Sequence, residues 1–181
     1  MANFYLDIET TGLNSKKDKI ITIQYQRLDQ KTGKPLNELK ILREWDSSEK
    51  EIIKKFLDET KITSKYPFDF IPIGYNLSFV SNFLKTRTFF YRLKPLYLLS
   101  RPFIDLKVIG ILMNKGEFKG AGLNQLTNKE KKGNNVPIWY EHKEYGKIIY
   151  YIHQKTKDFL DFNSWTLKKM PELLEEFNKK V

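Results

Sequence analysis

The chain has 181 residues and a formal net charge of +10, with 40% hydrophobic and 14% aromatic residues. This composition suits one packed domain over residues 1–181 and excludes an intrinsically disordered chain. The lack of cysteine excludes disulfides and thiolate metal sites, and no apolar run is long enough to span a membrane. No signal-peptide pattern opens the chain, so we expect a cytoplasmic protein. The positive charge favours a polyanionic partner, nucleic acid ahead of a membrane surface.

Hydrophobic periodicity, turn residues and capping patterns predict the elements in chain order. Strands are expected at residues 3–9, 19–28, 36–45 and 69–74. Helices are expected at residues 48–59, 76–93, 104–113, 123–128, 145–161 and 172–179, with loops at 116–122 and 129–137. Three successive strands followed by alternating helices and strands indicate an α/β fold with a mixed sheet that opens as an antiparallel meander.

Two acids, Asp7 and Glu9, stand two residues apart at the end of the first expected strand. Side chains at this spacing point to the same face of a strand. Two buried carboxylates repel each other and lose hydration unless a positive group lies between them. Divalent ions such as Mg²⁺ and Mn²⁺ are suited to this role because they prefer carboxylate oxygens. Alternatively, one acid is solvated at the strand end and the other caps the following turn.

From Asp7 to Leu13 the chain reads Asp-Ile-Glu-Thr-Thr-Gly-Leu. This string resembles the first motif of the DEDD superfamily of 3'-5' exonucleases, which have a ribonuclease H-like fold. The resemblance implies a ribonuclease H-like mixed sheet flanked by helices, with Asp7 and Glu9 as metal ligands and catalytic residues. It also implies that the next four residues approach the 3'-terminal nucleotide. They are Thr10, Thr11, Gly12 and Leu13, the last packing near the terminal base.

The segment Gly74–Leu84 resembles the second motif of the same superfamily. It implies substrate contacts for Asn76 and Phe79, and Asn76 also suits a helix N-cap. The third acid of the superfamily belongs at Val80, and valine cannot bind a metal ion or a metal-bound water.

The third motif has two possible registers on the expected helix 145–161. In the first, His153 is the general base and Asp158, five residues later, is a catalytic metal ligand. In the second, Tyr151 takes the place of the histidine and Lys155 stands where the acid belongs. The sequence leaves both registers open.

A stretch without Asp or Glu runs from Phe70 to Ile104 and carries five lysine or arginine residues among aromatic ones. Basic residues interleaved with aromatic residues suit phosphate contacts and base stacking. We therefore expect Lys85 and Arg87 to contact nucleic acid.

Together these features predict a metal-dependent 3'-5' exonuclease with two Mg²⁺ or Mn²⁺ ions, the second weakened by Val80. The alternative is a catalytically degenerate exonuclease-like domain that binds nucleic acid or a partner protein without cutting. A third possibility is an unrelated α/β protein. The sequence does not distinguish DNA from RNA, and specificity could come from a protein partner.

Overall fold

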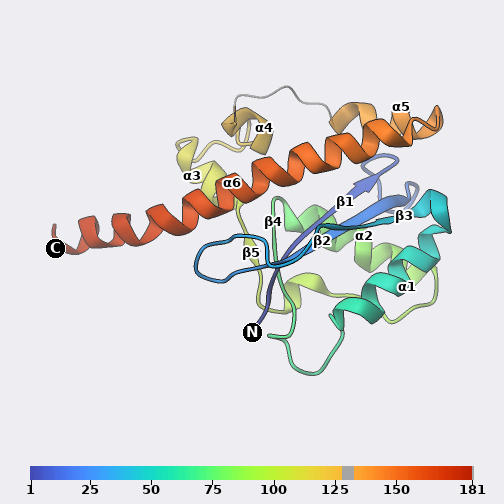
Figure 1. Ribbon diagram of the computed structural model, residues 1–181, viewed down its shortest axis with the longest axis horizontal. Helices are drawn as coiled ribbons and strands as arrows, with labels where there is room; N and C mark the ends of the chain where they lie inside the picture. Colours follow the sequence, from blue (N-terminus) through green and yellow to red (C-terminus); the bar gives the residue numbers. More distant parts are fainter. Residues whose placement is uncertain (128–132, 181) are drawn as a thin grey trace.

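A computed structural model describes residues 1–127 and 133–180 of the chain. Its strands form one sheet in the order β3-β2-β1-β4-β5 (Figure 1). They are β1 (Asn3–Thr10), β2 (Ile20–Leu28), β3 (Lys40–Arg43), β4 (Ile71–Gly74) and β5 (Ile104–Asp105). The first three strands are antiparallel, whereas β4 runs parallel to β1 and β5 runs parallel to β4. The predicted mixed sheet that opens as a meander is confirmed.

Helices pack against the sheet (Figure 1). They are α1 (Glu49–Thr60), α2 (Leu77–Phe90), α3 (Lys107–Met113), α4 (Leu123–Leu126), α5 (Val136–Glu141) and α6 (Tyr145–Asn178). Helix α1 lies between β3 and β4 in the chain, α2 lies between β4 and β5, and the other helices follow β5. Short 3-10 turns lie at Glu44–Asp46, Leu98–Ser100 and Gly133–Asn135. Helix α1 begins as predicted, because the hydroxyl of Ser48 caps it by accepting the N–H of Glu51 at 3.2 Å.

Several element boundaries differ from the sequence prediction. The third strand is shorter because the chain enters a 3-10 turn at Glu44. Residues Ile104–Asp105 pair with β4 before α3 begins, so the expected helix 104–113 starts later. The expected loop 129–137 ends in α5, which has Pro137 in its first turn, where a missing N–H costs nothing. The last residue of the expected helix 123–128 and the first residues of the expected loop 129–137 fall within residues 128–132, which lie outside the described part of the chain.

Helix α6 is one continuous element of 34 residues, although two helices were predicted there. Pro171 was expected to open a second helix but lies inside α6. Pro171 lacks the N–H that would bond the carbonyl of Leu167, and because residues 170–180 are exposed, water can reach this turn of the helix. The C-terminal part of α6 extends past the sheet in Figure 1. No helix in the described ranges is long and apolar enough to cross a membrane.

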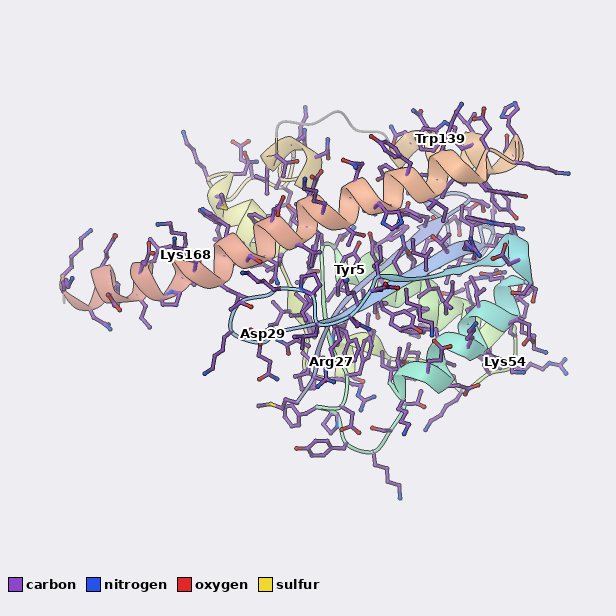
Figure 2. The ribbon with its side chains drawn as sticks, in the orientation of Figure 1. Tyr5, Arg27, Asp29, Lys54, Trp139 and Lys168 are labelled. Carbon is purple, nitrogen blue, oxygen red and sulfur yellow. The ribbon has the colours of Figure 1, made fainter. Side chains whose placement is uncertain are left out.

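The two faces of β1 belong to two different hydrophobic cores. Leu6 and Ile8 pack with buried side chains of α1 and α2 on one face. Tyr5 lies on the other face beneath α6, as Figure 2 shows, and its ring centroid is 4.6 Å from that of Phe159. Because alternate residues of a strand share a face, the face of Tyr5 is also that of the two acids that follow it.

Candidate functional site

The C-terminal end of β1 presents two acidic side chains to α6. Asp7 and Glu9 are 8% and 7% exposed, so both carboxylates are largely removed from water. Asp7 lies opposite Gln24 of β2, Glu9 lies opposite Thr22, and the sheet register shifts directly after Glu9. Both acids share one face, as their spacing predicts.

The positive group between these acids is Lys155 of α6. Its Nζ lies 2.6 Å from Oδ2 of Asp7 and 2.9 Å from Oε1 of Glu9. Asp7 also accepts the N–H of Ile8 at 2.9 Å and the hydroxyl of Tyr5 at 3.3 Å. The cation that two buried carboxylates require is therefore a side chain of the protein itself.

Burial and charge shift the protonation equilibria of this cluster. Burial raises the pKa of Glu9 to about 7, an effect that the Lys155 ammonium opposes and the Asp7 carboxylate increases. Burial alone would lower the pKa of Lys155, but the two carboxylates outweigh it and hold that pKa well above its usual value. Lys155 is thus a permanent cation near neutral pH and cannot serve as a general base.

Helical spacing directs Lys155 to the strand end. Tyr151, Lys155 and Asp158 are four and three residues apart in turn, so they lie along one side of α6. All three line the same pocket as Asp7 and Glu9. The Nζ of Lys155 lies 5.8 Å from the ring centroid of Tyr151. Of the two registers, the one that contains Tyr151 and Lys155 therefore places both of its residues in the pocket with Asp7 and Glu9.

His153 lies on another side of α6. It is two residues from Lys155, which corresponds to about 200° around a helix. Its side chain is exposed and lines a smaller hollow together with Gln26 and Lys157. The structure thus brings Asp158 into one pocket with Asp7 and Glu9 but places His153 outside that pocket.

Val80 occupies the position expected for the third acid. It is 1% exposed and belongs to the core that contains Leu6 and Ile8. Its side chain is entirely hydrocarbon and is not among those that line the pocket.

The donor set does not fit a pair of divalent ions. Within residues 1–127 and 133–180, no group of three or more His, Asp or Glu side chains is placed to hold a metal ion. Two-metal sites need carboxylates that bridge ions about 3.5–4 Å apart. Here the space between Asp7 and Glu9 is taken by the ammonium of Lys155. The Mg²⁺ or Mn²⁺ pair expected at Asp7, Glu9 and Asp158 would therefore have to displace this ammonium.

A pocket of about 1170 Å³ opens beside this cluster. Its walls come from the end of β1 and the loop after it, the start of α2, the α3–α4 segment, α5 and α6. The aromatic lining residues are Tyr75, Phe79, Phe118, Trp139, Tyr150 and Tyr151, and the basic ones are Lys107, Lys147 and Lys155. Figure 2 labels Trp139 on α5, beside the N-terminal half of α6. The pocket is larger than a typical small-molecule site of roughly 300–1,000 Å³, so it has room for a nucleotide.

Most of the residues predicted to bind substrate line this pocket. They are Thr10, Gly12, Leu13, Asn76 and Phe79. Leu13 projects from the loop after β1 with 85% of its surface exposed. Gly12 is required in that loop, because a Cβ there would lie only 2.5 Å from Oδ2 of Asp18. That carboxylate is fixed by the N–H of Asn14, which it accepts at 2.7 Å.

The other three predicted substrate residues do not line the pocket. The hydroxyl of Thr11 accepts the N–H of Lys19 at 3.1 Å and so holds the loop in place. Arg87 is buried and donates two hydrogen bonds to Glu49, at 2.8 and 2.6 Å. Lys85 lies on the exposed side of α2, with its Nζ 5.3 Å from the ring centroid of Tyr97.

The start of α2 is fixed by Asp105 rather than by a side chain of its own. The Asp105 carboxylate accepts the N–H groups of Asn76 and Leu77, both at 2.8 Å. Asn76 has a φ of +67°, and its Oδ1 accepts the ammonium of Lys107 at 3.2 Å. Asn76 and Lys107 therefore reach the pocket as a pair. Sequence reasoning assigned the N-cap to Asn76 and missed Lys107, whose nearness depends on β4 and β5 being neighbours.

Comparison with known proteins places the chain in a family. The model of the RNase H superfamily matches residues 4–161, so the chain belongs to that superfamily. Among curated proteins, none matches the chain by sequence. The ribonuclease H-like fold expected from the first motif is confirmed.

Solved exonuclease structures share this fold at low sequence identity. The zinc-bound form of an E. coli exonuclease I complex with single-stranded DNA is 14% identical, with a TM-score of 0.58 over 98% of this chain and 43% of that one. A 3'-exonuclease that recognises the 3' end of the histone mRNA stem-loop is 13% identical, with a TM-score of 0.62 over 93% and 64%. The nuclease domain of 3'hExo, a DEDDh family member bound to rAMP, is 14% identical, with a TM-score of 0.61 over 93% and 92%. The chain thus spans less than half of the exonuclease I chain, and at these identities the similarity concerns the fold.

Proposed function

We propose that this domain binds a 3' end of nucleic acid in its pocket and does not hydrolyse it. The observation that carries this proposal is the ammonium of Lys155 held between Asp7 and Glu9. It supports the hypothesis that the chain is a catalytically degenerate exonuclease-like domain.

The cluster lacks the chemistry that phosphodiester hydrolysis needs. In two-metal nucleases the ions generate the attacking hydroxide and stabilise the leaving oxygen. An ammonium group donates hydrogen bonds, but unlike a metal ion it cannot coordinate a water molecule and lower the pKa of that water. Val80 supplies no further ligand, and Lys155 stays protonated. We therefore expect a bound strand to remain intact.

Binding is supported by the pocket and by the charge of the whole chain. A net charge of +10 attracts a polyanion, and the pocket combines aromatic rings with lysines. We assign the terminal nucleotide to the loop after β1 and the start of α2, with Phe79 and Leu13 beside the base and Asn76 and Lys107 beside the sugar-phosphate. The exonuclease structures with this fold include complexes with single-stranded DNA and with rAMP.

One observation favours the alternative of an active metal-dependent exonuclease. Asp158 lines the same pocket as Asp7 and Glu9, so three acids face one cavity. Activity would require Lys155 to leave the two carboxylates when Mg²⁺ or Mn²⁺ and substrate enter. His153 would have to act from outside the pocket, so this alternative is the weaker one.

A 5'-labelled single-stranded oligonucleotide, offered as DNA and as RNA, tests both possibilities. With Mg²⁺ or Mn²⁺ we expect intact oligonucleotide and a gel shift that weakens with salt, unaffected by a chelator. A ladder that shortens from the 3' end, and disappears with the chelator and with Asp7→Ala, would establish the exonuclease instead. An absence of any shift at low salt would reject nucleic acid and leave a protein partner as the ligand.

A further inference from the structure

The C-terminal end of α2 and the segment after it expose three aromatic side chains, Phe89, Phe90 and Tyr97. Their exposed fractions are 75%, 62% and 55%, so the core does not account for them. We call these three residues the aromatic ledge. Large exposed aromatic rings are costly in water, and several of them in one short segment are typical of a binding surface.

Cations accompany the aromatic ledge. The Nζ of Lys85 lies 5.3 Å from the ring centroid of Tyr97, and the guanidinium of Arg87 lies 4.5 Å from that of Phe90. Arg92 and Lys94, which follow α2, are both exposed. The charge of Arg87 is compensated by Glu49, which is 3% exposed, so the positive charge near the rings is carried by Lys85, Arg92 and Lys94. The ledge therefore presents positive charge beside flat rings, which suits the phosphates and bases of a single strand.

Helix α2 joins the ledge to the pocket. Its first turn lines the pocket through Phe79, whereas Ser78, Asn82, Lys85 and Phe89 form one exposed stripe along the helix. Ser78 precedes Phe79 in the chain, so the stripe begins next to the pocket and ends at Phe89 of the ledge.

The loop after β1 lies along the same stripe. The hydroxyl of Ser15 accepts the side-chain amide of Asn82 at 3.0 Å and donates to the hydroxyl of Thr86 at 3.2 Å. The same loop carries Leu13 into the pocket and also bears Lys16 and Lys17, both exposed. The surface between pocket and ledge is thus bordered by a basic loop on one side and by Lys85 on the other.

We propose that this surface is the track of a single strand whose 3' end occupies the pocket and whose upstream bases stack on Phe89. This inference rests on the proposed function and extends it to the length of strand that is bound. Phe79 and Phe89 are ten residues apart, which is about 15 Å along a helix. At a spacing of about 3.4 Å per stacked nucleotide, the ledge meets the strand about four nucleotides before its end.

Fluorescence anisotropy with 5'-labelled oligothymidylates of three and ten nucleotides tests the track. The longer strand is expected to bind the unmodified protein more tightly. The substitution Phe89→Ala should weaken binding of the ten-nucleotide strand about tenfold, because base stacking on an aromatic ring is lost, and leave the three-nucleotide strand unchanged. Phe177→Ala is the matched control, since Phe177 on the distal part of α6 is 62% exposed like Phe90, and it should change neither affinity.

A second variant tests the charge of the track separately. Lys85→Gln should reduce the slope of log affinity against log salt by about one for the ten-nucleotide strand only. Equal affinity for both lengths, or an equal loss for both lengths in Phe89→Ala, would overturn the track while leaving the pocket intact. Failure of both oligonucleotides to bind would instead reject the proposed function. An affinity of Phe89→Ala equal to that of the unmodified protein, with altered self-association in analytical ultracentrifugation, would assign the ledge to a protein contact.

Discussion

The ammonium nitrogen of Lys155 lies 2.6 Å from the carboxylate of Asp7, and this contact joins the end of β1 to the N-terminal third of α6. It connects residues that are far apart in the sequence, across the layer boundary between sheet and helix. The same nitrogen binds Glu9, so one lysine balances the charge of two buried acids only in part. From this contact we predict an effect on the stability of the domain and on its response to divalent metal ions.

Removal of the lysine should destabilise the fold. In Lys155→Met the two acids lose their cation while staying buried, and the free energy of unfolding should fall by about 2–4 kcal/mol. The loss should be larger at pH 8 than at pH 5, because protonation relieves the unpaired carboxylates. Urea denaturation measures it, with Lys147→Met as the control, since Lys147 pairs with Glu144 in an exposed position that contributes at most about 1 kcal/mol. Equal losses in the two variants would show that the buried contact has no special role.

An acid at position 155 should convert the cluster of Asp7, Glu9 and Lys155 into a metal site. Lys155→Asp would place a third carboxylate beside Asp7 and Glu9, and the repulsion among them would be relieved by a divalent ion. We expect Mn²⁺ to raise the melting temperature of this variant and to leave that of the unmodified protein unchanged. Calorimetric titration with Mn²⁺ provides the direct measurement, and EDTA should have no effect on the unmodified protein. Stoichiometric binding of Mn²⁺ by the unmodified chain would contradict this account.

The stability of the domain should depend on pH through Glu9. Burial raises its folded-state pKa to about 7, above its unfolded value, so the folded state binds this proton more tightly. The associated stabilisation is complete below the unfolded pKa and is lost as the pH rises towards 7, by roughly 3 kcal/mol at most. Melting temperatures measured between pH 4 and pH 8 should fall over this window. In Glu9→Gln the fall should be smaller, and an unchanged profile would assign it to other groups.

Arg87 should stabilise the folded state, because it forms a buried ion pair with Glu49. Its guanidinium holds both oxygens of Glu49, and the two side chains are only 8% and 2% exposed. Arg87→Met would leave Glu49 buried without its partner and should cost about 3–5 kcal/mol of unfolding free energy. Tyr91→Phe removes the 2.8 Å hydrogen bond to Glu49 and the 3.5 Å hydrogen bond that the same hydroxyl accepts from Arg87, and it should cost about 1 kcal/mol. Thermal denaturation measures the loss in both variants. A smaller loss for Arg87→Met than for Tyr91→Phe would contradict the buried pair.

Local patterns were sufficient to predict the parts of the fold that depend on neighbours in sequence. The buried strand β1, the capping of α1 by Ser48 and the meander of the first three strands all follow from short segments. Boundaries failed where a distant partner decides them. Ile104 and Asp105 are extended because β4 offers them a partner, and α6 passes through Pro171 because that turn is exposed.

The sequence was sufficient to predict the site residues on β1 but left two alternatives for those on α6. The spacing of Asp7 and Glu9 fixes their shared face, whatever the rest of the chain does. The choice between His153 and Lys155 depends on the rotation of α6 about its axis relative to the sheet. That rotation is set by Ile148, Ile152 and Phe159, whose burial against the sheet directs Lys155 inward. Arg87 likewise looked like a surface cation in the sequence, because Glu49 lies 38 residues before it.

A counter-ion that belongs to the chain behaves differently from one taken up from solution. A bound metal is subject to mass action, so its occupancy rises and falls with the free concentration and vanishes with a chelator. The ammonium of Lys155 is tethered through its own backbone, and its effective concentration at the two carboxylates is set by the geometry of α6. We therefore expect the state of this strand end to be the same in a magnesium-rich and in a magnesium-depleted medium. A strand that it holds would leave only by dissociation, at a rate independent of divalent ions.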